Sequence, residues 1–280
     1  MTTTWNCKKK ANGVFRASLN IRRYEQVPGE HYDEDWTSAP VANDVMIRIM
    51  LVLMLISGIY AHLVDVQGAF LLGTFENAER IYCHVPEGWE DYFESGVVLL
   101  LLKTVYGLKQ AANCFYNLLV RTMRALKFER NVAEPAMYYK WHPIHGLVVW
   151  LSWVDDLACY GEKEAVLEEV ERMSTKFDID NVGPLTEYLG CIMHFNDSEN
   201  GNGPRSIRMT QPTLIQRLTD EFNPLQTNMI TPVAHKTRLL KARADECVST
   251  SQQKEYRSIV GLLIHIARWS RPDVMPSICR

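Results

Sequence analysis

The chain has 280 residues, of which 47% are hydrophobic and 22% are charged, so it can bury a sizeable core and does not resemble a disordered chain. A formal net charge of −3 gives no bulk electrostatic sign of a nucleic-acid partner, so any such partner must be recognised from local basic clusters. Seven scattered cysteines, without a CxxC pair or a secretory start, favour free thiols in a reducing compartment.

The first part of the chain predicts a strand, a loop and a helix. The strand covers residues 14–19, and the polar, proline-containing loop covers 25–42. A helix is predicted over 43–60, because Asn43 or Asp44 can cap its start and the apolar residues that follow show no β-alternation. Its apolar stretch is too short to cross a bilayer, so we expect a buried helix and no membrane partner.

Three short apolar segments and one longer amphipathic segment follow. We predict strands over residues 61–66, 81–85 and 97–102, and a helix over residues 110–127. The four leucines at 99–102 are assigned to the core. Apolar residues at helical spacing support the helix.

The second half predicts a strand and a turn within 135–146, then two strands over 146–160 that meet at Asp155-Asp156. Further predictions are a charged amphipathic helix over 162–177, an exposed turn over 196–206, and helices over about 212–222 and 251–269. The order of elements resembles the split βαβ pattern, in which an antiparallel sheet is backed by two helices.

Two basic clusters occur along the chain, and each fits a solvated face as well as a nucleic-acid contact. They consist of Lys8, Lys9, Lys10, Arg16, Arg22 and Arg23, and of Arg205, Arg208, Arg217, Lys236, Arg238 and Lys241.

The paired acids Asp155 and Asp156 lie between two β-prone runs, and a hairpin turn with solvated carboxylates explains them. Asp65 also lies near the end of a β-prone run, with no Lys or Arg beside it in sequence. If folding gathers all three acids, they form a hard-oxygen site suited to two Mg²⁺ ions, with Mn²⁺ as a substitute. Both interpretations remain open from these residues alone.

Six segments strengthen the second interpretation. They are DVQGAFLLG (65–73), VPEGW (85–89), LLKTVYGLKQA (101–111), LSWVDDLACYG (151–161), EYLGCI (187–192) and YRSIVGLLIHIARWSRPDV (256–274). In this order they resemble the reverse transcriptase of copia-type retrotransposons, over nearly the whole chain.

The resemblance implies an α+β right-hand polymerase. Fingers and an antiparallel palm would occupy residues 1–195. A partial thumb and the start of a connection to a missing RNase H domain would occupy 196–280. The helix over 212–222 would be the first thumb helix, lying along the duplex.

The resemblance also implies roles for individual residues. Asp65, Asp155 and Asp156 match catalytic acids that bind metal, and Phe70 matches an aromatic steric gate that excludes a 2′-hydroxyl group. Gln110 matches a contact to the incoming nucleotide and template. The other matches are Lys109, Arg16 and Arg22 as phosphate or template contacts, and Tyr188, Leu189 and Gly190 as the primer grip.

Four positions depart from the pattern of the family. Ser18 replaces a usual arginine in the region that holds the triphosphate, so weaker dNTP binding is expected, with Arg16 as partial compensation. The other departures are Arg23 for glycine, Gln67 for a frequent lysine, and Trp153 for tyrosine.

The implied function is RNA-directed DNA polymerisation by two-metal nucleotidyl transfer to a primer 3′-hydroxyl group. The implied partners are an RNA template, a DNA primer or duplex, dNTPs, and the integrase and RNase H regions of a parent polyprotein. A virus-like particle in the cytoplasm is the expected location. Two alternatives stay open: a decayed, inactive remnant that at most binds nucleic acid, and another palm enzyme such as a nucleotidyl cyclase. The GLKQA segment disfavours the cyclase.

Overall fold

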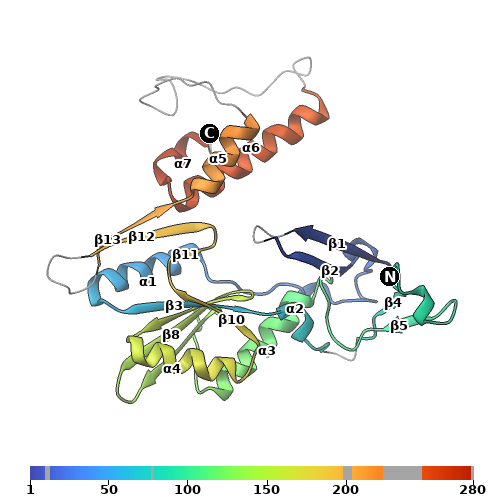
Figure 1. Ribbon diagram of the computed structural model, residues 1–280, viewed down its shortest axis with the longest axis horizontal. Helices are drawn as coiled ribbons and strands as arrows, with labels where there is room; N and C mark the ends of the chain where they lie inside the picture. Colours follow the sequence, from blue (N-terminus) through green and yellow to red (C-terminus); the bar gives the residue numbers. More distant parts are fainter. Residues whose placement is uncertain (10–12, 77–78, 198–203, 223–247, 279–280) are drawn as a thin grey trace. The chain divides into compact units, whose positions relative to one another are not determined.

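A computed structural model describes residues 1–9, 13–76, 79–197, 204–222 and 248–278 (Figure 1). These residues form two compact units, Met1–Pro184 and Leu185–Arg280. The predicted division into fingers and palm before residue 196 and thumb after it stays a prediction. Residues 195 and 196 both lie in strand β12 (Cys191–Asp197), which pairs with the strands on either side of it. Within the described ranges, every helix is too short or too polar to cross a bilayer. Five residues of the two basic clusters lie outside the described residues, either wholly or in their side chains: Lys10, Arg205, Lys236, Arg238 and Lys241.

The first unit is built on a six-stranded sheet in which every neighbouring pair is antiparallel. The order across the sheet is β10-β3-β9-β8-β7-β6. The strands are β3 (Tyr60–Val66), β6 (Glu129–Arg130), β7 (Met137–His142), β8 (Gly146–Trp153), β9 (Asp156–Gly161) and β10 (Ile179–Pro184). The prediction of an antiparallel sheet is confirmed.

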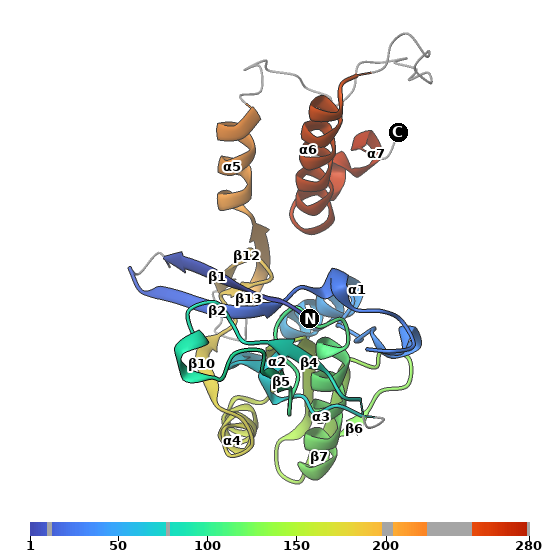
Figure 2. The same cartoon turned by 90° about the vertical axis from the view of Figure 1, so that its right-hand side faces the viewer.

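Two helices, α3 (Ala111–Ala125) and α4 (Lys163–Ser174), cover one face of this sheet, and α1 (Asp44–Ser57) lies on the other side (Figures 1 and 2). Each fully buried large apolar side chain stabilises this packing by about 1.5–3 kcal/mol. The core under α3 and α4 includes Val64, Val66, Phe115, Leu119, Met123, Trp150, Leu157, Cys159, Val166 and Met173.

Successive side chains of a strand point to opposite faces. Val64 and Val66 of β3 enter the core under α3 and α4, so Asp65 between them projects from the other face. The same alternation applies to Leu157 and Asp156 of β9. The sheet therefore presents both acids on the face away from α3 and α4.

Helix α1 begins and ends as its sequence requires. The Asn43 side chain accepts a hydrogen bond from the Met46 amide at 2.9 Å, and Gly58 ends the helix at a φ of 64°. The helix is shorter than the predicted 43–60 because this left-handed glycine stops it.

Two hairpins extend the first unit: β1 (Thr3–Lys9) with β2 (Phe15–Ile21), and β4 (Tyr82–His84) with β5 (Val98–Leu100). The Ile21 amide donates to the Tyr106 carbonyl at 2.8 Å. A Cβ at Gly107 would lie 2.1 Å from the Ile21 oxygen, so only glycine permits this approach. The assignment of the leucines at 99–102 to the core holds for Leu99 and Leu101, which pack against a small buried cluster, and is wrong for the other two. Leu100 is 45% exposed and Leu102 is 82% exposed.

The second unit combines a three-stranded antiparallel sheet with helices. The sheet contains β11 (Glu187–Tyr188), β12 and β13 (Pro204–Thr210), and the helices are α5 (Pro212–Phe222), α6 (Thr250–Trp269) and α7 (Met275–Ile278). Ser249 and Gln252 form a capping box at the start of α6. The short helix α2 (Ala69–Leu72) and four 3₁₀ turns complete the described elements: Arg23–Glu25, Glu34–Trp36, Glu90–Tyr92 and Pro272–Val274.

Candidate active site

A row of carboxylates crosses three adjacent strands of the central sheet. In the strand register, Asp65 of β3 lies opposite Asp156 of β9 on one side and opposite Asp180 of β10 on the other. Side chains directly opposite each other in an antiparallel pair share a face, with Cβ atoms about 4.5–5.5 Å apart. The fold therefore gathers Asp65 and Asp156, and adds Asp180, which sequence reasoning missed.

The fourth acid, Asp155, lies in the two-residue turn between β8 and β9, where Trp153 pairs with Asp156. The Asp155 carbonyl accepts a hydrogen bond from the Val66 amide at 3.0 Å, which ties the turn to the end of β3. Val154 has a φ of 58°, a left-handed conformation that is strained for a β-branched residue. Such strain persists where the surrounding structure fixes it, commonly at functional sites.

Crowding perturbs the charge state of one acid in this row, Asp156. Burial, together with the negative charges of Asp155 and Asp65, raises the pKa of Asp156 to about 6. Like charges directly opposite each other destabilise a sheet. The arrangement costs stability unless cations neutralise it, and clustered carboxylate oxygens are the donors that Mg²⁺ and Mn²⁺ prefer.

A cavity of about 440 Å³ opens in front of three of the acids, Asp65, Asp155 and Asp180. Its volume lies in the range of about 300–1,000 Å³ that is typical of small-molecule sites. The lining residues come from five segments of the first unit and include Asp65, Asp155, Asp180, Gln67, Arg16 and Tyr106. Arg16, a predicted phosphate contact, thus lines the same cavity as the carboxylates.

Phe70 lies behind one wall of this cavity. Its ring packs edge-on against Tyr106, with centroids 5.4 Å apart and an interplanar angle of 85°. The Thr104 hydroxyl donates to the Phe70 carbonyl at 2.7 Å and fixes the start of α2. Tyr106 lines the cavity, and Phe70 supports it. The gate role of Phe70 stays a prediction.

Gln110 and Lys109 belong to a polar network inside the protein. Gln110 is only 2% exposed, and its amide donates to the His31 carbonyl at 3.0 Å and to Glu79 at 2.9 Å. Its side-chain oxygen accepts from Gln26 at 3.0 Å. The Lys109 ammonium donates to the Tyr32 hydroxyl at 2.5 Å and lies 4.3 Å from the centre of that ring. The contacts seen for both side chains are structural, and their nucleotide contacts stay predictions.

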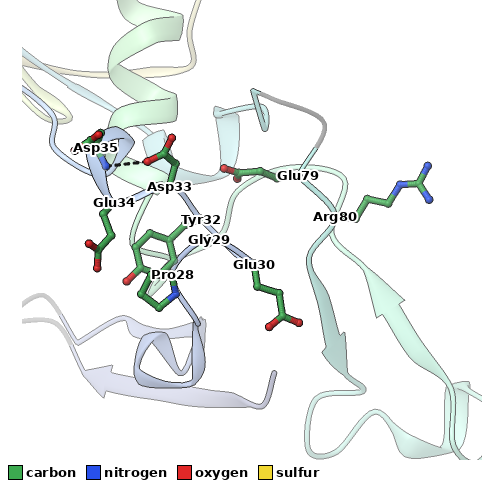
Figure 3. Close-up of a pocket in the computed structure, with 9 residues that line it drawn as sticks. All are labelled: Pro28, Gly29, Glu30, Tyr32, Asp33, Glu34, Asp35, Glu79 and Arg80. Atoms are coloured by element: carbon green, nitrogen blue, oxygen red, sulfur yellow. Dashed lines mark hydrogen bonds between the residues drawn. The ribbon is translucent and has the colours of Figure 1, made fainter.

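A larger cavity, of about 970 Å³, lies beside this network (Figure 3). Its charged lining residues are Glu30, Asp33, Glu34, Asp35, Glu79 and Arg80. Five carboxylates against one guanidinium repel phosphate groups. This cavity is therefore a poor nucleotide site despite its size.

The predicted primer-grip residues form the turn between β11 and β12 in the second unit. Tyr188 is 4% exposed and pairs with Cys191 in the strand register. Leu189 has a φ of 52° and Gly190 a φ of 76°, and two positive φ values are the signature of a type I′ turn. Leucine is strained in this conformation, which marks the turn as constrained. Its contact with a primer stays a prediction, as does the phosphate contact of the exposed Arg22.

Residues 1–235 match the family described as reverse transcriptase (RNA-dependent DNA polymerase). The retrovirus-related Pol polyprotein from transposon TNT 1-94 of Nicotiana tabacum is 28% identical over 288 residues, covering 98% of this chain and 21% of that protein. The Pol polyprotein from transposon RE1 of Arabidopsis thaliana is 27% identical, covering 99% of this chain and 18% of that protein. A putative transposon Ty5-1 protein of Saccharomyces cerevisiae is 25% identical, covering 75% of this chain and 65% of that protein.

This chain therefore spans about a fifth of the length of the two Pol polyproteins. A telomerase from Candida albicans, solved in complex with a fragment of telomeric RNA, aligns with 78% of this chain and 50% of that chain at 9% identity. Its TM-score of 0.35 is too low to establish a shared fold. The family match and the relatives confirm the resemblance to copia-type elements. The chain belongs to the reverse transcriptase (RNA-dependent DNA polymerase) family.

Proposed function

We propose that this chain is the polymerase part of a copia-type Pol polyprotein and extends a DNA primer on an RNA or DNA template. The observation that carries this proposal is the register of β10, β3 and β9, which aligns Asp180, Asp65 and Asp156 beside Asp155. If Asp155 and Asp156 were only solvated residues of a hairpin turn, no acid of β3 or β10 would have to lie beside them. The integrase and RNase H regions of the parent polyprotein would be its covalent partners, and a cytoplasmic virus-like particle would be its location.

The fold can be divided like a right hand. The six-stranded sheet with α3 and α4 would be the palm, and the hairpins β1–β2 and β4–β5 would belong to the fingers. The second unit would be the start of the thumb. Phosphate contacts would dominate the binding of nucleic acid. Because this chain is not basic as a whole, they would come from local basic residues.

Reverse transcriptases generally use divalent metal ions. Asp65, Asp155 and Asp156 would hold two Mg²⁺ ions, or Mn²⁺, because they offer hard oxygen donors. Asp65 and Asp156 share one face of the sheet, Asp155 lines the same cavity as Asp65, and the negative charges of Asp65 and Asp155 act on Asp156. When bound, such ions neutralise the negative charge that develops during nucleotidyl transfer. Arg16 would bind the triphosphate of the dNTP, and Tyr106, supported by Phe70, would form the wall beside its sugar.

The test is primer extension by the 280-residue chain, with Asp155→Asn as the decisive variant. Loss of this carboxylate should reduce incorporation by several orders of magnitude, or about 4 kcal/mol, as for other electrostatic deletions in active sites. The fold should survive, because Asp155 occupies a partly exposed turn and its backbone hydrogen bond is unaffected. Circular dichroism and thermal unfolding provide the control. A folded variant that keeps more than a tenth of the wild-type incorporation contradicts the assignment.

One observation favours the second candidate, an inactive remnant that at most binds nucleic acid. Ser18 stands two residues from Arg16 on β2, so the two side chains share a face of the strand. A guanidinium at Ser18 would thus flank Arg16, and its absence weakens the hold on a triphosphate. A folded wild-type chain that binds duplex yet incorporates no nucleotide supports the remnant.

A further inference from the structure

We propose that Gln67 and Asp180 form a positioning pair that fixes the carboxylate of Asp65 for metal binding. This inference rests on the proposed function, since it assigns Asp65 to the metal site. Neither residue of the pair touches substrate in the proposal. Both act through Asp65.

The geometry of Gln67 carries this inference. Its side-chain amide donates one hydrogen bond to Asp65 Oδ2 at 3.0 Å and a second, short one to Asp180 Oδ2. An NH₂ group has two hydrogens, so it can serve both carboxylates at once. The backbone amide of Gln67 donates to the Asp178 carbonyl at 2.9 Å, which anchors the residue between the ends of β3 and β10.

The sharp turn at Gly68, directly after Gln67, determines the position of Gln67 at the end of β3. Gly68 has a φ of 61° and starts α2, so the chain leaves β3 in a sharp turn. Gln67, Asp65 and Asp180 line the same cavity. The amide is therefore held at the rim of the site, next to the carboxylate that it orients.

The strand register explains why a neutral donor is needed here. Asp65 and Asp180 are directly opposite each other, where like charges destabilise the sheet. A neutral amide between them gives each carboxylate a hydrogen bond and adds no cation to compete with a metal. Because the terminal torsion of aspartate is broad, a fixed partner at Oδ2 selects one orientation of the group. A carboxylate has about four lone-pair sites, so this bond leaves it able to bind a cation.

Hydrogen-bond partners of metal ligands typically contribute about 10–100-fold to metal affinity. Gln67→Leu, which has no donor, should therefore weaken Mn²⁺ binding at least tenfold. Asp180→Asn should have a smaller effect, since its amide oxygen still accepts from Gln67.

The experiment measures Mn²⁺ binding to the full chain by electron paramagnetic resonance, together with the Mg²⁺ dependence of primer extension. Asn117→Leu is the matched control, because it removes an amide that donates to Glu76 at 3.1 Å, outside the cavity. We expect Asn117→Leu to bind Mn²⁺ like the wild type. We expect Gln67→Leu to raise the half-saturating Mg²⁺ concentration by the same factor by which it weakens Mn²⁺ binding. If Gln67→Leu does not fold, Asp180→Leu removes the other anchor of the amide and gives the same test.

The two readouts separate this inference from the proposed function. If Gln67→Leu folds and binds Mn²⁺ within twofold of the wild type, the positioning pair is overturned. It is also overturned if the wild-type chain binds no Mn²⁺. If the wild type binds Mn²⁺ but extends no primer, and Gln67→Leu weakens that binding at least tenfold, the polymerase proposal fails and the positioning pair stands.

Discussion

Replacing Asp156 by asparagine should make the folded chain more stable at neutral pH in the absence of metal. Burial, with the charges of Asp155 and Asp65, raises the pKa of Asp156 from 3.8 to about 6. Between these two values the folded chain binds more protons at this group than the unfolded chain does. Stability therefore falls as pH rises through this window, and the full cost is present above pH 6.

The size of the effect follows from the two pKa values. The folded and unfolded pKa values differ by about two units, and each unit corresponds to ~1.4 kcal/mol, so the ionised Asp156 lowers the free energy of unfolding by about 3 kcal/mol at most. Because Asp156 is only partly buried, solvent screening reduces this to about 1–2 kcal/mol. Asparagine removes the charge with little change in shape, so the variant should recover that amount at pH 7 and very little at pH 4.

The assay is urea unfolding of the wild type and Asp156→Asn in EDTA, from pH 4 to pH 8. Asp91→Asn, at an exposed position in a 3₁₀ turn, serves as the control for a lost surface charge. A divalent cation should stabilise the wild type more than Asp156→Asn, because the crowded charges are then neutralised. An Asp156→Asn variant that is less stable than the wild type at pH 7 refutes the electrostatic account.

Three further outcomes are expected. Phe70→Ala should raise the use of ribonucleotides relative to deoxynucleotides, because Tyr106 at the cavity wall loses the ring that packs against it. If the ratio of the kcat/KM values for ribonucleotide and deoxynucleotide is unchanged and activity is intact, Phe70 does not support a steric gate. Ser18→Arg should lower the KM for dNTP by about ten- to a hundredfold at most, because a hydrogen bond to a charged group contributes roughly 1.5–3 kcal/mol. A KM that does not fall means that position 18 is remote from the triphosphate. Lys140→Met should destabilise the fold by about 3 kcal/mol, because the fully buried Glu169 carboxylate loses its ion pair with Lys140 at 2.6 Å and keeps only the one with Arg172 at 3.2 Å. The double variant with Glu169→Leu should recover most of the lost stability, and equal stability of the single and double variants argues against this pair.

Much of the fold could be predicted because local signals and burial agreed. The cap at Asn43, the helical spacing in 110–127 and the two β-prone runs around Asp155 all gave elements that the structure contains. The polar strand Thr3–Lys9 was missed, because its sequence TTWNCKK lacks clear alternation and only its pairing with β2 makes it a strand. The apolar character of residues 99–102 alone suggested the core, but only Leu99 and Leu101 pack against it, while Leu100 and Leu102 are exposed.

The site was predictable only in part, for a related reason. Asp65, Asp155 and Asp156 could be found from motifs, but Asp180 carries no local mark beyond the alternation in Asp178-Ile-Asp180. Its position opposite Asp65 is a property of strand register, which connects segments more than a hundred residues apart. The burial of Gln110 within a network of Gln26 and Glu79 is also a tertiary feature, and no spacing in the sequence encodes it.

The most direct test of the polymerase proposal is incorporation of dTTP by the purified 280-residue chain on poly(rA) primed with oligo(dT). We predict extension that requires Mg²⁺ or Mn²⁺, that depends on the template, and that Asp65→Asn and Asp155→Asn both abolish while remaining folded. A folded wild-type chain that binds Mn²⁺ and primed template but adds no nucleotide would contradict the proposal.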